Sequence, residues 1–474
     1  MSELASESFN AERPRTRTPS ASEVPAASLV VIDNAAIATV DPNGTEHARG
    51  HIVVRNGFID RVASGTAERP AEDHDYIDAS GCLVTPGLVN THHHLYQWAT
   101  RGYARDAELF EWLTTLYPVW GRLTEEVTRA AGTAGMAKLA LTGCTTIADH
   151  HYVFPTEGGD QIGALVHGAR QLGVRLHAVR GSMDRGESQG GLPPDNLVED
   201  TEEALLGTEK AIADFHDPDP LGLIRIAVGP CSPFSVSREL MEQAAVLARR
   251  LGVRLHTHLA ETIDEEEQCL AEFGCTPAQY AEQLGWLGDD VWLAHTIHLS
   301  DEAIKRFGQT GTGSSHCPTS NGRIAAGMAP VRQLLDAGAP VGLGVDGAAS
   351  SESGGLGEEL KAALLVARFR GGATALTIRE ALWMGTMGGA RCLGRDHEIG
   401  SIEPGKVADL AVWRMDDLDH AGIADPVAAL VLGSAPKVDR LLVGGRSVVA
   451  DGELRTADLD TITRDLAKAA EVLR

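Results

Sequence analysis

The sequence has little that would suit a membrane, a nucleic acid or an oxidising compartment. No apolar run reaches the roughly 18 residues that a membrane-spanning helix needs. Positive charge is scarce: 41 Lys and Arg stand against 66 Asp and Glu, a formal net charge of −25, which excludes the positive surface that binds a phosphate backbone. The seven cysteines are odd in number and scattered, without a Cys-x-x-Cys pair. We therefore expect free thiols, a cytoplasmic location, and neither a membrane nor a nucleic-acid partner.

Residues 1–27 also lack the apolar segment of a signal peptide. They are rich in Ser, Pro, Ala, Glu and Arg, which predicts a disordered tail. The remaining chain is longer than a typical single domain, and its ordinary hydrophobic content of 43% can fill a large core. We expect one large domain with an added smaller one.

Short β-type runs stand near both ends of the chain. Residues 29–32, 52–54 and 58–59 are apolar, and Asn56-Gly57 supplies a hairpin turn between the last two. Similar runs return at 410–412 and 440–443, where Gly444-Gly445 is the turn. We expect residues 28–87 and 396–474 to meet in one small discontinuous β-sandwich domain that ends in a C-terminal helix.

Between these segments the sequence alternates between strand and helix patterns. Helices are predicted at 124–141, 201–215, 237–251 and 300–307, and a later one begins at a capping box formed by Thr377 and Glu380. The pattern is typical of an α/β fold, a (β/α)8 TIM barrel, over residues 88–395. The predicted strands lie at 83–90, 145–150, 175–179, 224–229, 254–258, 291–295, 311–316 and 340–345.

Polar residues that bind metals follow several of these strands. His92 and His94 are two residues apart, so on a strand they point to the same side, and neutral imidazole is the commonest metal ligand. His256 and His258 compete for the next position, and we choose His258 because Glu261 follows it by three residues. Asp346 completes the set as a ligand or as a base touching the bound water. Its alternative role is a turn residue before a glycine.

Glu261 and His295 are predicted to handle protons. Metal-activated water needs a neighbouring general acid and base, and we assign this role to Glu261. Regular strand geometry would point Glu261 away from His258, so we expect the chain to depart from it there. His295 would orient the attacking water. The acidic residues that follow, 264–267, are interpreted as a solvated run.

The sequence also lacks the lysine of a two-metal site. A bridging ligand in barrels of this kind is often a modified lysine on the fourth strand. Between Lys138 and Lys305 the only lysine is Lys210, which lies in the predicted helix 201–215. We therefore expect one metal ion.

Together these motifs resemble the amidohydrolase superfamily, in its single-metal deaminase branch. The resemblance runs from residues 85–90, Thr-Pro-Gly-Leu-Val-Asn, to residues 400–410. Triazine hydrolases and hydroxyatrazine-type aminohydrolases share part of the pattern. Several stretches are similar to bacterial 8-oxoguanine deaminases, at residues 92–97, 116–120, 148–152, 190–194, 230–234 and 316–321.

The resemblance implies a specific reaction and a specific metal site. The metal would be zinc, with iron as the alternative, and its ligands would be His92, His94, His258 and Asp346. Glu261, His295 and Asp346 would transfer protons while water replaces an exocyclic amine of a heterocycle, converting 8-oxoguanine to urate and ammonia. A homodimer is also implied. Predicted contacts to the substrate ring are Gln97, His150 and His151.

One segment departs from the relatives. After Asp346-Gly347 they usually carry a Ser-Ala-Ser-Asn-Asp type loop, whereas here residues 348–355 read Ala-Ala-Ser-Ser-Glu-Ser-Gly-Gly. We expect this segment to border the substrate pocket, so the identity of the heterocycle stays open. The alternatives are an s-triazine or other N-heterocycle hydrolase and a catalytically inactive barrel scaffold.

Overall fold

Eight parallel strands close into a barrel in the computed structural model, which describes residues 27–474. Of the predicted tail, only Ala27 falls within the described residues. The barrel confirms the predicted fold class, and its strands are buried throughout apart from Arg225. In barrel order they are β6 (Leu88–Asn90), β8 (Cys144–His151), β9 (Arg175–Ser182), β10 (Ile224–Pro230), β11 (Leu255–Leu259), β12 (Val291–His295), β13 (Gly313–His316) and β14 (Val341–Leu343).

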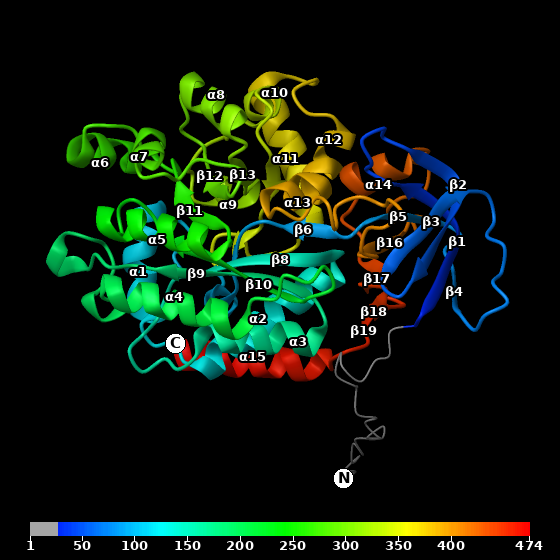
Figure 1. Ribbon diagram of the computed structural model, residues 1–474, viewed down its shortest axis with the longest axis horizontal. Helices are drawn as coiled ribbons and strands as arrows, with labels where there is room; N and C mark the ends of the chain where they lie inside the picture. The colour runs from blue at the N-terminus through cyan, green and yellow to red at the C-terminus, as the bar shows by residue number, and fades with distance from the viewer. Residues whose placement is uncertain (1–26) are drawn as a thin grey trace, which may run out of the picture.

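Helices follow the strands and cover the barrel (Figure 1). The predicted helix starts at Thr124, Ser237 and Ser300 are N-caps, whose side chains each accept a hydrogen bond from the backbone amide three residues on. The main covering helices are α2 (Glu125–Leu141), α3 (Gln161–Leu172), α4 (Thr201–Phe215), α5 (Arg238–Leu251), α6 (Ile263–Phe273), α7 (Pro277–Gln283), α8 (Asp301–Thr310), α9 (Pro318–Arg323), α10 (Val331–Asp336) and α11 (Leu356–Gly371).

Further helices complete the chain. The predicted capping box of Thr377 and Glu380 is present at the start of α12 (Ile378–Trp383). A π-helical turn, Met384–Gly388, and α13 (Gly389–Cys392) follow it. Helix α14 (Pro426–Leu432) lies near the sheet that the two chain ends form beside the barrel (Figure 1). The C-terminal α15 (Leu459–Leu473) packs against α2 beneath the barrel, where Figure 1 shows it in red. None of the helices in residues 27–474 combines the length and apolar character needed to span a bilayer.

The single strand predicted at residues 83–90 is wrong, because the structure divides it into two. β5 (Cys82–Pro86) belongs to a sheet outside the barrel, and β6 begins the barrel. The break falls at Gly87, whose backbone amide donates to the Asp409 carbonyl at 2.9 Å. A side chain there would overlap that of Thr145, so glycine permits the close approach.

Strands from both chain ends pair in one nine-stranded sheet beside the barrel (Figure 1). Both predicted turns are present, since Asn56-Gly57 and Gly444-Gly445 have positive φ and join adjacent antiparallel strands. The domain limits at residues 87 and 395 stay predictions. Besides β5, the strands are β1 (Leu29–Ala38), β2 (Glu46–Arg55), β3 (Phe58–Ser64), β4 (Asp75–Asp78), β16 (Leu410–Arg414), β17 (Val438–Val443), β18 (Arg446–Ala450) and β19 (Glu453–Leu454).

A buried ion pair ties the sheet to the barrel. Arg175 of β9 donates to Asp409 through Nε at 2.7 Å and Nη2 at 3.1 Å, and both side chains are almost inaccessible. Two parallel hydrogen bonds fix the relative orientation of the groups as well as their contact. Because Arg175 is the first residue of β9, this ion pair fixes the sheet at the end of the barrel where the strands begin.

Candidate active site

The first and last strands of the barrel are extended by a short pair that begins the site. β7 (His93–His94) pairs in parallel with β15 (Asp346–Gly347), and the Asp346 amide donates to the His92 carbonyl at 3.1 Å. This pairing brings Asp346 Oδ1 to 3.4 Å from His92 Nε2 and 3.3 Å from His94 Nε2. Residues more than 250 positions apart in sequence thus converge because β6 and β14 are neighbours in the barrel.

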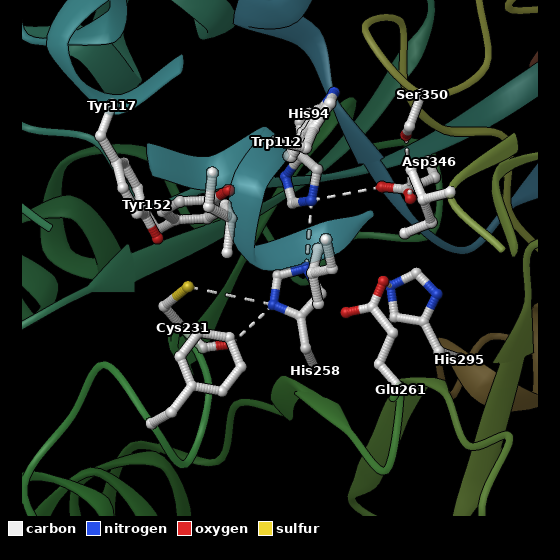
Figure 2. Close-up of a pocket in the computed structure, with 14 residues that line it drawn as sticks. His94, Trp112, Tyr117, Tyr152, Cys231, His258, Glu261, His295, Asp346 and Ser350 are labelled. Atoms are coloured by element: carbon white, nitrogen blue, oxygen red, sulfur yellow. Dashed lines mark hydrogen bonds and ion pairs between the residues drawn. The ribbon is translucent and has the colours of Figure 1, made fainter. Parts of the chain in front are cut away.

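The hydrogen-bond partners of His94 and His258 fix which ring nitrogens are free. His94 Nδ1 lies 2.6 Å from the His150 carbonyl, and His258 Nδ1 lies 2.7 Å from the Cys231 carbonyl. A carbonyl oxygen only accepts, so each Nδ1 carries the proton and each Nε2 presents a lone pair. These two Nε2 atoms lie 3.1 Å apart (Figure 2).

His256 gives His92 the same tautomer. Its Nδ1 donates to the Trp292 carbonyl at 2.8 Å, which leaves Nε2 to accept from His92 Nδ1, also at 2.8 Å. His92 Nε2 is therefore bare, and it is buried without a hydrogen-bond partner. The structure places His258 among the converging groups and His256 behind His92, where it orients a neighbouring ligand candidate.

Burial sets the charges of this cluster. It lowers the pKa of His92 and His258 well below the ordinary value, and it also lowers the pKa of His94. Burial opposes ionisation of Asp346, but its interactions with His92, His295 and His94 hold its pKa well below the ordinary value. Three neutral imidazoles and one carboxylate thus direct lone pairs at a common point.

Ligand atoms of His92, His94 and Asp346 lie within 4.8 Å of one another, and so do those of His92, His258 and His295, which are the dimensions of a metal site. A tetrahedral ion with bonds of about 2.0–2.1 Å separates its ligand atoms by about 3.3 Å. The His94 and His258 nitrogens are 3.1 Å apart, and Asp346 Oδ1 lies 3.3 Å from His94 and 3.4 Å from His92. Without a cation the bare nitrogens and the carboxylate would repel one another, so the donor set fits a divalent ion. Lys210, the lysine considered for a second site, lies on α4, where it is exposed and pairs with Asp214.

Glu261 lies beside this cluster because the chain turns sharply after β11. Ala260 has a φ of +52°, which is the departure from strand geometry that we expected. Glu261 Oε1 lies 3.5 Å from His295 Nε2, and His295 Nδ1 contacts Asn321 Oδ1 at 3.0 Å. Burial raises the pKa of Glu261 to about 7, partly offset by His295. A carboxyl group near neutrality can both hold and release a proton.

The sequence interpretation of residues 264–267 as a solvated run is wrong at Glu265. This side chain is 1% exposed, and its two carboxylate oxygens accept the backbone amides of Ala260 at 2.9 Å and Glu261 at 2.8 Å. Burial raises the pKa of Glu265. The sequence does indicate this role through the spacing Thr262-x-x-Glu265. Such spacing is typical of a helix start at which the side chain of the third residue accepts a hydrogen bond from the backbone before the helix.

Asp346 is held from its other side by two serines. Ser320 of α9 donates to Oδ2 at 2.5 Å, and Ser350 lies 3.3 Å from the same oxygen. Ser350 belongs to the segment 348–355 that departs from the relatives, and it lines the cavity described next. The expected position of this segment at the pocket is confirmed.

A cavity opens in front of the cluster (Figure 2), and it encloses about 410 Å³ together with its solvent-filled mouth. Its wall away from the histidines is mainly aromatic and apolar, contributed by α1 (Leu109–Trp120) and the loops after β8 and β10. Sequence reasoning did not assign these residues, although several fall in the stretches that resemble deaminases. The lining residues are His94, Leu109, Trp112, Leu113, Tyr117, Tyr152, Cys231, Phe234, His258, Glu261, His295, Ile324, Asp346 and Ser350.

The three predicted ring contacts do not line this cavity. His150 and His151 each direct Nε2 at a backbone carbonyl 2.8 Å away, and His150 stacks on His258 with ring centroids 4.9 Å apart. Gln97 Oε1 accepts the Ala349 amide at 3.3 Å. All three are buried and engaged by the protein itself, and their contact with substrate stays a prediction.

A model of the amidohydrolase family matches residues 83–448, which include every group of the site. The chain belongs to the amidohydrolase family. It is 46% identical to 8-oxoguanine deaminase of Pseudomonas aeruginosa, an alignment that covers 92% of this chain and 97% of the relative. It is 36% identical to isoxanthopterin deaminase of an unknown prokaryote, over 88% of this chain and 90% of that one.

Solved structures agree with this membership. Atrazine chlorohydrolase of Arthrobacter aurescens TC1, in complex with zinc, superposes with a TM-score of 0.88 at 33% identity, covering 93% of this chain and 100% of that chain. Family and relatives together identify the chain as a hydrolase that acts on carbon–nitrogen bonds, as deaminases do.

Proposed function

We propose that this amidohydrolase converts 8-oxoguanine and water to urate and ammonia. The observation that carries the proposal is the 46% identity, over nearly the full length of both chains, to a protein named 8-oxoguanine deaminase. The site supports the same chemistry, because it places a donor set for a metal ion, a titratable glutamate and a largely apolar cavity at one end of the barrel.

We propose zinc as the ion, one per subunit, with iron as the alternative. His92, His94 and His258 would hold it through Nε2 and Asp346 through Oδ1, and the zinc complex of the related chlorohydrolase supports this choice. When bound, such an ion lowers the pKa of a water molecule towards about 7 and supplies the nucleophile.

Glu261 is proposed as the group that gives a proton to the heterocycle. As the water oxygen bonds to the ring carbon that bears the exocyclic amine, the electron pair of the ring C=N bond moves to nitrogen. Glu261, with its pKa raised to about 7 by burial, protonates that nitrogen. His295, 3.5 Å from Glu261, is placed to orient the water and to exchange protons with this carboxyl group.

Asp346 is proposed to take part in the release of ammonia. Its ionised carboxylate can accept the proton lost by the attacking water. The other proton of that water passes to the amine, the carbon–nitrogen bond breaks, and the carbonyl group of the product forms as ammonia leaves. The proton held by Asp346 then returns to Glu261 through His295. Ser320 and Ser350 keep Asp346 in place for this exchange by contacting Oδ2.

A second candidate is hydrolysis of an s-triazine by the same water attack with chloride or an alkylamine as the leaving group. The TM-score of 0.88 to atrazine chlorohydrolase favours it, whereas the identity of 33% is lower than that to the purine deaminase. The third candidate is a catalytically inactive scaffold. The metal-ligand candidates in the site argue against it, whereas failure of the purified protein to bind zinc would support it.

We also propose a cytoplasmic homodimer. All seven cysteines are free and buried, which fits a reducing compartment. The dimer rests on the family resemblance alone. Size-exclusion chromatography with light scattering distinguishes a dimer from a monomer of 50.2 kDa.

Ammonia release by the zinc-loaded protein tests the proposed function. The panel contains 8-oxoguanine, guanine, isocytosine, cytosine, a pterin and melamine, with chloride release measured for a chlorotriazine. Rapid release from 8-oxoguanine supports the proposal, and Glu261→Gln protein is the control for background hydrolysis. Turnover of another compound alone would contradict 8-oxoguanine as the substrate but agree with the proposed chemistry. Residues 348–355 would then be the first segment to replace by the loop of the relatives.

A further inference from the structure

Tyr117 carries a buried hydroxyl without a hydrogen-bond partner in the part of the chain that the structure describes. The residue is 1% exposed, lies on α1 and lines the cavity. Burial raises the pKa of its phenol well above the ordinary value, so the hydroxyl keeps its proton and remains a donor. Buried hydroxyl groups are nearly always paired with protein, water or ligand, and one that lines a cavity is free to pair with a ligand atom.

The hydroxyl faces the side of the cavity opposite Glu261 and Asp346 (Figure 2). In Figure 2 Tyr117 enters from the side opposite Glu261 and Asp346, and its oxygen points towards the space beside Cys231. Cys231 places its thiol at this end of the cavity.

Besides Tyr117, the Tyr152 hydroxyl and the Cys231 thiol are the polar groups on this wall. No Lys or Arg is among the described lining residues, which leaves the wall without a cation for a phosphate or carboxylate. Trp112 Nε1 is already committed to the Ala349 carbonyl at 3.2 Å, and the Ser350 hydroxyl contacts Asp346 and Ser320. Tyr117 is thus a free donor in a neutral, largely apolar surface suited to an uncharged planar base.

We propose that Tyr117 determines specificity by donating a hydrogen bond to an exocyclic oxygen at the end of the base opposite the amine that is lost. This inference rests on the proposed function. In 8-oxoguanine the amine is on the six-membered ring and the 8-oxygen is at the far end of the five-membered ring. A base with its amine beside Glu261 would therefore direct its 8-oxygen towards Tyr117. Guanine has no such oxygen and leaves the hydroxyl unpaired, which disfavours its binding.

Steady-state kinetics of Tyr117→Phe with both purines tests the inference. The variant should lose about 10- to 100-fold in kcat/KM for 8-oxoguanine, mainly through KM, and should keep its value for guanine. Tyr280→Phe is the matched control, because Tyr280 also has a buried, unpartnered hydroxyl but lies on α7 outside the cavity lining. Equal effects on both purines, or no effect on either, would overturn the inference.

A binding measurement separates this inference from the proposed function. Hypoxanthine and 6,8-dioxopurine lack the amine and differ only in the 8-oxygen. The unaltered protein should bind 6,8-dioxopurine more tightly, and Tyr117→Phe should remove that preference. No preference in the unaltered protein would overturn the role of Tyr117, whereas a preference without any turnover of 8-oxoguanine would overturn the proposed reaction and keep the recognition.

Discussion

The carboxylate of Glu265 holds the backbone of Glu261. It accepts the amides of Glu261 and Ala260 at 2.8 and 2.9 Å, and Ala260 occupies the left-handed conformation that turns the chain out of β11. The turn is what directs the Glu261 side chain towards His295. A glutamate on a helix thereby positions the proposed proton donor without contacting the substrate.

Replacing Glu265 by glutamine should lower kcat and leave the metal bound. The amide group can accept one of the two backbone N–H groups but presents its own N–H to the other, so the turn at Ala260 shifts. A displacement of about 1 Å at a proton donor costs on the order of 10²-fold in rate. Glu267→Gln, on the exposed side of the same helix, is the control and should behave like the parent. An unchanged kcat in Glu265→Gln would contradict the positioning role.

Glu261→Gln should bind zinc normally and lose turnover by about 10²- to 10⁴-fold, because the variant cannot donate the proton that the ring nitrogen needs. Metal content by atomic emission, measured with kcat on the same preparation, checks both parts. A metal-free variant would show that Glu261 is a ligand and that the division of roles is wrong.

His92→Ala should lose both metal and activity, because His92 Nε2 is one of the four converging donors. Chelation of the unaltered protein should have the same effect, and zinc should restore activity to the chelated protein but not to the variant. His167→Ala is a distant control, since His167 is an exposed residue of α3. Full metal content in His92→Ala would refute the site.

Glu359 should make stability depend on pH. Burial raises its pKa to about 8, one oxygen accepts the Thr319 amide at 3.1 Å and the other is unpartnered. Its folded pKa lies above the unfolded value, so between about pH 4.5 and 8 unfolding releases a proton. The stability that this group contributes is complete below that window and is lost as the pH rises through it.

Glu359→Gln should therefore gain stability relative to the parent as the pH increases from 6 to 8, by up to about 1.4 kcal/mol per pH unit. Urea unfolding of both proteins at several pH values measures the difference. Glu358→Gln, the neighbouring residue on α11, is the control. A difference between Glu359→Gln and parent that is constant with pH would show that Glu359 is ionised in the folded protein.

Much of the barrel and the donor set could be predicted because they depend on local patterns. Apolar runs that end in His92, His94, His258 and Asp346 specify strands and the face on which their ends meet. Helix starts such as Ser300 could be predicted because capping depends only on residues within one helical turn.

What sequence reasoning missed depends on long-range packing. The division at Gly87 results from contact with Thr145, and Glu265 is buried only because the β11 turn folds over it. Tyr117 reaches the cavity because α1 packs above the barrel end, a contact between segments distant in the chain. Only Glu265 has a local signal, the helix-start spacing Thr262-x-x-Glu265. No periodicity or charge pattern within the other two segments indicates the break at Gly87 or the position of Tyr117.

Urate formation from 8-oxoguanine, followed by its ultraviolet absorbance together with ammonia release and zinc content, tests the central claim most directly. We expect one zinc ion per chain, one ammonia per urate, and loss of both products on chelation. A protein that binds zinc but leaves 8-oxoguanine unchanged would contradict the proposed substrate, and one that binds no metal would contradict the site on which the account depends.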